Sequence, residues 1–104
     1  MKRATLLLLL LALFACGEDE RAKPLSEPGE KLYGVRGVIL SRNASGNSVN
    51  LDHEAIPGFM EAMKMEYAVR GADVAKLPAD GSRIEAKLHV TSRAYWITDV
   101  KQVP

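Results

Sequence analysis

Apolar and polar residues alternate along much of the chain, and this alternation predicts β-strands. Residues 83–92 show it most clearly, because every second residue from Ile84 to Val90 is apolar and the residues between them are polar. Successive side chains of a strand point to opposite faces, so the pattern is typical of a strand with one buried face. Residues 48–53 alternate in the same way, and His53 falls on their apolar face.

The stretch 59–69 fits two patterns. It is built of good helix formers, and Met60, Met63 and Tyr67 would share one face of a helix. As a strand, it would place Met63, Met65 and Tyr67 on one face with polar residues between them. The strand alternation is the more regular, because Met65 would leave the helical face. Local propensity does not decide between the two.

Two further stretches have strand composition. Residues 31–41 are rich in β-branched and aromatic residues, and the glycines among them, Gly34 and Gly37, predict the bends of a small barrel. Residues 94–103 alternate imperfectly, which predicts a bulge. A single helical turn is expected at 73–77.

Five short strands without a long helix are typical of a small closed barrel, in which no strand edge is left unpaired. We therefore expect an all-β domain over residues 31–104, with the architecture of a five-stranded OB-type barrel. The 89 residues that follow residue 15 are enough for one small domain and not for two.

The first fifteen residues have the layout of a secretory signal. Lys2 and Arg3 form a positive start, and residues 6–15 are an unbroken apolar run. The run is too short to cross a bilayer as a helix, which needs about 20 apolar residues. We expect residues 1–15 to be removed as a signal peptide.

Cys16 is the only cysteine, so the chain cannot form an intramolecular disulfide. The segment Leu13-Phe14-Ala15-Cys16 resembles the lipobox of bacterial lipoproteins, although Phe14 is bulkier than the residue usual there. The resemblance implies that Cys16 is lipidated and that the protein is periplasmic and anchored to a bacterial membrane. Acylation also removes a thiol that would be reactive in an oxidising compartment. Residues 16–30 carry many charges and only one large aliphatic residue, which predicts a disordered tether.

Charge and composition exclude several classes of function. Removing Lys2 and Arg3 with the signal leaves 12 of the 14 basic residues against 13 acidic ones, a formal charge of −1. This balance gives no reason to expect nucleic acid as a partner. No catalytic triad, carboxylate pair or phosphate loop stands out, so we do not predict an enzyme.

Residues 52–65 contain every methionine except the initiator, together with His53. Thioether and imidazole are ligands that suit soft Cu(I) or Ag(I). If 59–69 is a strand, His53 ends one strand facing inward, while Met63 and Met65 begin the next strand on a shared face. A loop between adjacent antiparallel strands brings their near ends together, so these three side chains could converge at the barrel mouth.

This part of the chain resembles the CusF-like periplasmic copper- and silver-binding proteins. The resemblance rests on the inward His53, the Pro-bearing loop after it and the Met63-Lys64-Met65 pair, and it extends over Val35 to Val103. In that family a histidine and a Met-x-Met pair bind Cu(I), and a tryptophan three residues before the first methionine caps the metal. The resemblance implies that His53, Met63 and Met65 are the metal ligands.

The chain departs from the family at the capping position, which holds Met60 with Phe59 beside it. The loop is also one residue shorter. Either Met60 adds a third thioether, or Phe59 replaces the aromatic cap; we favour Met60 as a ligand. The form His-Glu-x-Ile-Pro-Gly-Phe-Met-x-Ala-Met-x-Met also resembles a branch of the family that lacks the tryptophan.

The predicted function is that of a monomeric Cu(I)- and Ag(I)-binding protein. It would buffer the metal or deliver it by ligand exchange to a protein partner in copper efflux or copper-enzyme assembly. The alternative is a metal-free OB-type barrel for protein interaction or oligosaccharide binding, with the methionines as core residues. Two other residues are predicted to lie outside the chemistry: Trp96 as a barrel-closing aromatic, and His89 as an exposed side chain on a polar strand face.

Overall fold

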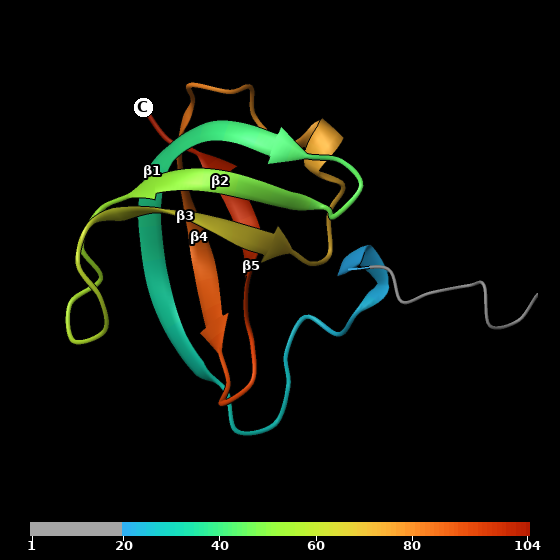
Figure 1. Ribbon diagram of the computed structural model, residues 1–104, viewed down its shortest axis with the longest axis vertical. Coiled ribbons are helices and arrows are strands. Elements are labelled where there is room, and N and C mark those ends of the chain that lie inside the picture. The colour runs from blue at the N-terminus through green and yellow to red at the C-terminus, as the bar shows by residue number, and fades with distance from the viewer. Residues whose placement is uncertain (1–19) are drawn as a thin grey trace, which may run out of the picture.

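The computed structural model describes residues 20–104 and contains the five predicted strands as a closed barrel (Figure 1). Two short 3-10 helices accompany the barrel, and the second of them confirms the helical turn expected near residue 75. The elements in chain order are η1 (Glu20–Ala22), β1 (Lys31–Asn43), β2 (Ser48–His53), β3 (Met63–Val69), η2 (Val74–Lys76), β4 (Arg83–Val90) and β5 (Tyr95–Gln102).

The strand order around the barrel is β1-β2-β3-β5-β4, and β4 returns to β1 to close it. All neighbours are antiparallel except β3 and β5, which run parallel. β1 closes the barrel because its 13 residues are long enough to pair with β4 along one part and with β2 along the other. The fold is thus the all-β, five-stranded OB-type barrel expected from the sequence.

The stretch 59–69 is a strand over its second half and not a helix. β3 pairs with β2 along its whole length, from His53 opposite Met63 to Ser48 opposite Ala68. Tyr67 is fully buried, and Met65 on the same face is half-buried. The partner strand satisfies the backbone hydrogen bonds of β3 and buries its apolar face, which outweighs the helix propensity of the residues.

Gly37 lies where β1 pairs with β2 and β4 at the same time, opposite His53 on one side and Ile84 on the other. A Cβ at Gly37 would lie 2.5 Å from the backbone oxygen of Asp52 and 2.8 Å from the Cα of His53. Gly37 therefore permits the close approach of β1 to the end of β2. A Cβ at Gly34 would meet no atom within 4 Å, so of these two glycines only Gly37 lies at a close approach.

We expect Gly37→Ala to displace the end of β2 and to destabilise the barrel by about 1–3 kcal/mol, the usual cost of overpacking a close contact. Gly34→Ala is the matched control, because the same methyl group would lie in open space. Urea unfolding of both variants measures the difference. Equal free energies of unfolding for Gly37→Ala and Gly34→Ala would contradict the close approach.

Residues 20–30, called the strap below, lie against the outer surface of the barrel. They do not form the disordered tether expected for residues 16–30. Residues 1–19, with the predicted signal peptide and Cys16, lie outside the described residues. The indole Nε1 of Trp96 donates to the carbonyl of Leu25 at 2.9 Å. The Arg70 guanidinium donates to the carbonyl of Pro24 at 3.0 Å and to the Glu27 carboxylate at 2.7 Å. Hydrogen bonds to residues distant in the sequence hold the strap. Its docking could not be predicted from the sequence, because the strap has few apolar residues to indicate a buried face.

His89 is buried beneath the strap, at 4% exposure, and so the prediction that it is exposed was wrong. Its ring stacks on Trp96, with centroids 5.3 Å apart. Its Nδ1 lies 3.0 Å from the Glu30 carboxylate and its Nε2 lies 2.7 Å from the hydroxyl of Thr98. The alternation had placed His89 correctly on the outer face of β4. The strap covers that face, and it buries Trp96 there as well, outside the barrel core.

Hydrogen bonding lowers the pKa of Glu30 below its ordinary value of 4.5, first through the backbone N–H of Glu27 and further through His89. A carboxyl whose pKa is depressed by folding stabilises the fold above its unfolded pKa, and that contribution is lost as the pH falls through the folded pKa. Acid should therefore loosen the strap below about pH 4.5. Between pH 7 and a pH below about 4.5, we expect the free energy of unfolding to fall less in Glu30→Gln than in the unaltered protein. Urea unfolding at the two pH values measures this difference. The same acid dependence in both proteins would contradict this role.

Candidate metal centre

The end of β2 and the start of β3 form one side of the candidate site. In the register of the two strands His53 pairs with Met63, and Leu51 pairs with Met65. Side chains directly opposite each other in an antiparallel pair lie on the same face with Cβ atoms about 5 Å apart. The faces predicted from the alternation are confirmed here, and they place the imidazole of His53 and the thioethers of Met63 and Met65 on the same face of the two strands.

His53 is 1% exposed, and its two ring nitrogens have different surroundings. Nδ1 lies 2.8 Å from the backbone carbonyl of Glu54, and a carbonyl can only accept, so Nδ1 carries the proton. Nε2 is therefore the nitrogen with the free lone pair. It is buried without a hydrogen-bond partner in the described residues. A histidine held by one nitrogen with the other unpaired is the usual arrangement of a metal ligand.

The loop between β2 and β3 is folded back on itself. Ile56 and Met60 exchange backbone hydrogen bonds of 2.8 and 3.0 Å, and Gly58 between them has φ +76°. Pro57 followed by a glycine with positive φ is the sequence of a type II turn. Ile56 is buried in the core and anchors the loop, so Met60 has a defined place on the barrel.

Tyr67 lies beneath these side chains, fully buried on the inner face of β3. Its hydroxyl is 3.7 Å from the sulfur of Met65 and 3.9 Å from the sulfur of Met60. The ring meets the His53 ring edge-on, with centroids 5.8 Å apart. Burial, with a smaller effect from Tyr95, raises the pKa of Tyr67 to about 12, so the hydroxyl is protonated at neutral pH. The alternation placed Tyr67 on this face, but nothing in the sequence marked it as part of the site.

Phe59 and Met60 turn in different directions. The Phe59 ring stacks on Tyr33 of β1, with centroids 4.6 Å apart and planes 12° from parallel. Met60 instead contacts the Tyr67 hydroxyl beside Met65. The structure thus brings the side chain of Met60 to the same hydroxyl as that of Met65, whereas Phe59 packs against β1.

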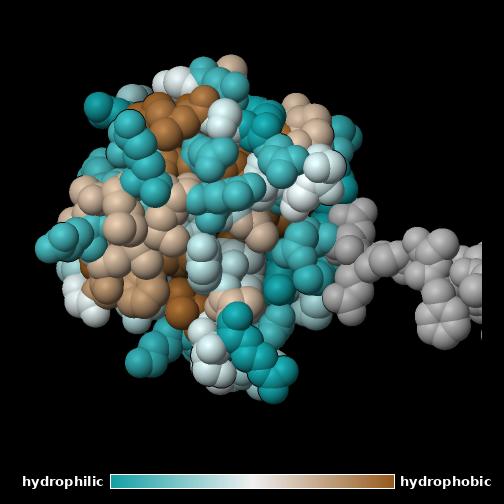
Figure 2. Space-filling view, in the orientation of Figure 1, coloured by the Kyte–Doolittle hydropathy of each residue, from teal (hydrophilic) through white to brown (hydrophobic). Residues whose placement is uncertain are grey.

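The site opens toward solvent at Met63, which is 46% exposed. Hydrophobic side chains gather on the side of the molecule where the β2–β3 loop lies (Figure 2). Phe59 and Met63 are the large exposed hydrophobic residues of this region. A metal held here would therefore lie near the surface, within reach of another protein.

Nitrogen and sulfur donors dominate the site. No group of three or more His, Cys, Asp or Glu side chains that could hold a metal occurs in residues 20–104. Hard ions and zinc prefer the oxygen or thiolate ligands of such groups. One imidazole and three thioethers suit Cu(I) or Ag(I).

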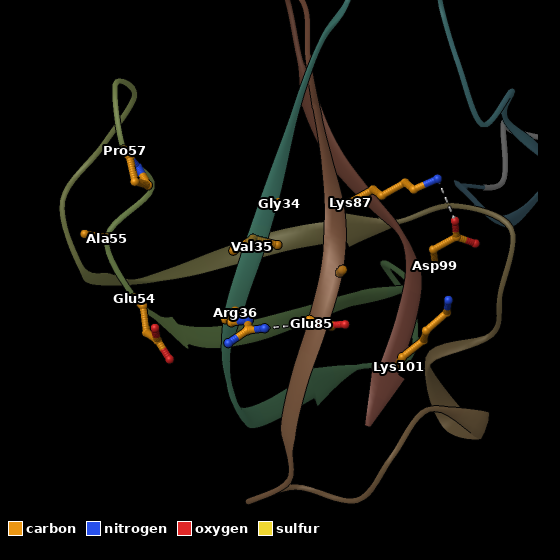
Figure 3. Close-up of a pocket in the computed structure, with 11 residues that line it drawn as sticks. Gly34, Val35, Arg36, Glu54, Ala55, Pro57, Glu85, Lys87, Asp99 and Lys101 are labelled. Carbon is orange, nitrogen blue, oxygen red and sulfur yellow. Dashed lines mark ion pairs between the residues drawn. The ribbon is translucent and has the colours of Figure 1, made fainter. Parts of the chain in front are cut away.

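A separate groove of about 470 Å³ is lined by residues of the loop, such as Ala55 and Pro57, and by residues of β1, β4 and β5 (Figure 3). Charged side chains line it, including the ion pair between Lys87 and Asp99 at 3.2 Å. None of the methionines lines the groove. It is distinct from the thioether site and carries no soft ligand.

No helix within residues 20–104 is long and apolar enough to cross a membrane.

The fold and the site can now be set beside known proteins. Residues 32–102 match the family model described as "Copper binding periplasmic protein CusF". The chain belongs to this family. Its members are periplasmic copper- and silver-binding proteins, which confirms the resemblance seen in the sequence.

Solved structures of CusF-family proteins share the barrel. Apo-CusF from Escherichia coli has a TM-score of 0.64 at 13% identity, over 79% of this chain and 99% of the CusF chain. The Ag(I) form of Escherichia coli CusF gives 0.63 at 12% identity, over 76% and 100%. The C-terminal domain of SilB from Cupriavidus metallidurans gives 0.58 at 25% identity, over 71% and 90%. Among curated protein sequences none matches the chain.

Proposed function

We propose that this CusF-family chain binds Cu(I) and Ag(I) through His53, Met63, Met65 and Met60. The observation that carries the proposal is the buried Nε2 of His53, which has a free lone pair and no hydrogen-bond partner among residues 20–104, at the position paired with Met63. An unpaired buried nitrogen is costly unless a ligand takes it up. A solved relative supports the same cargo, because it is an Ag(I) complex of Escherichia coli CusF.

The proposed role is that of a buffer or metallochaperone. The exposed edge at Met63 leaves the metal accessible, so ligands of a partner protein could replace the protein's ligands one at a time. Neutral ligands need little deprotonation, which makes such exchange feasible at neutral pH. The partner would belong to a copper efflux system or to the assembly of a copper enzyme.

The location that we propose is the periplasmic face of a bacterial membrane, with Cys16 as the lipid anchor. An anchor with more than one acyl chain holds a protein stably at a membrane, whereas a single chain binds only marginally. The segment 13–16 supports this proposal through its likeness to a lipobox.

Metal-dependent melting of residues 16–104 tests the proposed function. A metal that binds only the native state at 100 times its Kd stabilises the fold by about 2.7 kcal/mol, which raises the Tm of a domain of this size by about 10 °C or more. We expect that shift with Ag(I), and with Cu(I) under anaerobic conditions, and little shift with Zn(II). A Tm unaffected by Ag(I) and Cu(I) would overturn the proposal and favour a metal-free interaction barrel.

A further inference from the structure

Two of the four proposed ligands contact the same buried hydroxyl. Met65 comes from β3 and Met60 from the loop before it, and their sulfurs lie 3.7 and 3.9 Å from the Tyr67 oxygen. The Tyr67 hydroxyl makes no other hydrogen bond among residues 20–104. The two sulfurs are therefore the hydrogen-bond partners of a hydroxyl whose residue is fully buried.

We infer that the hydroxyl of Tyr67 is a positioning group that holds Met60 beside Met65 as a member of the metal centre. The inference rests on the proposed function and deepens it, because it names what brings the fourth ligand to the site. Tyr67 does not itself bind the metal in this account. It acts through the orientation of the two methionine side chains.

The chemistry of a thioether allows this double role. The Tyr67 hydroxyl has one proton, which the two sulfurs share as acceptors. Each sulfur has two lone pairs, so one can face this proton while the other faces the metal. A methionine has three rotatable bonds and no preferred direction of its own. A ligand that is already oriented loses less freedom on binding, and outer-shell hydrogen bonds serve this purpose in metal sites.

Met60 depends more than Met63 or Met65 on a contact that orients its side chain. The two β3 methionines are oriented by the ladder to β2, where Met63 lies opposite His53 and Met65 opposite Leu51. Met60 lies in the loop before β3, and within residues 20–104 its backbone is held by the bridge to Ile56 and by no strand ladder. The contact with Tyr67 joins its side chain to the barrel.

Tyr67→Phe tests the inference, because it removes the hydroxyl and keeps the ring that packs in the core. Tyr33→Phe is the matched control, since Tyr33 stacks on Phe59 of the same loop, whereas the hydrogen bonds to methionine sulfur within residues 20–104 come from Tyr67. Competition titration with Ag(I) should show affinity about tenfold weaker in Tyr67→Phe, the lower end of the usual effect of an outer-shell partner, and unchanged affinity in Tyr33→Phe.

Methyl NMR on ¹³C-labelled methionine supplies a readout that a loss of packing would not produce. In the unaltered protein Ag(I) should shift the methyl signals of Met60, Met63 and Met65. In Tyr67→Phe we expect the shift of Met60 alone to be lost. Met60→Leu should likewise weaken Ag(I) binding in the unaltered protein and have little further effect in Tyr67→Phe, because the two changes remove the same ligand.

The outcomes separate this inference from the function on which it rests. If Tyr67→Phe keeps both the affinity and the Ag(I)-induced shift of Met60, the positioning role is overturned while the metal site stands. A lack of any Ag(I)-induced methyl shift in the unaltered protein would overturn both. Loss of the Met60 shift alone, with those of Met63 and Met65 kept, supports the inference.

Discussion

Replacing Met63 and Met65 together by leucine is expected to weaken Ag(I) and Cu(I) binding by more than about 100-fold. Loss of an outer-shell partner usually weakens metal affinity by about 10- to 100-fold. We expect a larger loss here, because the double variant removes two of the proposed metal ligands. Leucine has nearly the volume of methionine, and such swaps cost less than about 1.5 kcal/mol each in a core. Both side chains also lie toward the barrel mouth, and Met63 is exposed. The protein should therefore fold and lose its metal affinity.

Competition with a Cu(I) chelator under anaerobic conditions measures this loss, and urea unfolding of the metal-free protein checks the fold. Lys64→Gln is the control, since Lys64 lies between the two methionines and is exposed. We expect it to leave affinity within a few fold. Unchanged affinity in Met63→Leu with Met65→Leu would show that the methionines only fill space, as the metal-free alternative requires.

Replacing Trp96 by alanine is expected to cost about 3–5 kcal/mol of stability, a large part of the 5–15 kcal/mol typical of a whole domain. The indole is fully buried between the His89 ring and the Arg70 guanidinium, which lies 3.7 Å from its centroid. The substitution removes both contacts and the hydrogen bond to Leu25. It should therefore release the strap as well as lower the free energy of unfolding.

Urea unfolding measures the loss of stability, and tryptic cleavage after Arg21 reports release of the strap. Trp96→Phe is the milder variant: it keeps an aromatic ring and removes the N–H donor, at a cost of about 1 kcal/mol. Its cleavage should be faster than that of the unaltered protein, while Ag(I) affinity should stay the same in a folded variant. Slow cleavage in both variants would contradict the strap, and lost affinity in Trp96→Phe would connect Trp96 to the metal.

The sequence could predict the part of the candidate site that lies on two consecutive strands of the chain. His53 ends a strand whose alternation shows its inner face, and Met63 and Met65 alternate as the next strand begins. Pairing of adjacent antiparallel strands then brings the three together with no knowledge of the rest of the fold. The sequence favoured Met60 as a ligand but did not place its side chain, because its direction depends on how the loop packs.

The strap and His89 show why the remaining features could not be predicted. Alternation tells which face of β4 carries the polar residues, and His89 does lie on the outer face. It does not tell what covers that face. The cover comes from Leu25 and Glu30, about 60 residues earlier, through the hydrogen bonds of Trp96 and His89. Gly71 adds room for Leu25, since a Cβ there would lie 2.5 Å from the leucine Cδ2.

The sequence by itself predicted the five strands and the all-β class, because these follow from the period of two along each strand. It also predicted that His53, Met63 and Met65 share one face, because neighbouring strands pair. The tertiary structure decided that Met60 meets Tyr67, that Phe59 turns to Tyr33 and that the strap buries His89 and Trp96. Each of these depends on contacts between segments separated by loops. A local pattern shows where a side chain points, and only the closed barrel and the docked strap show what it meets.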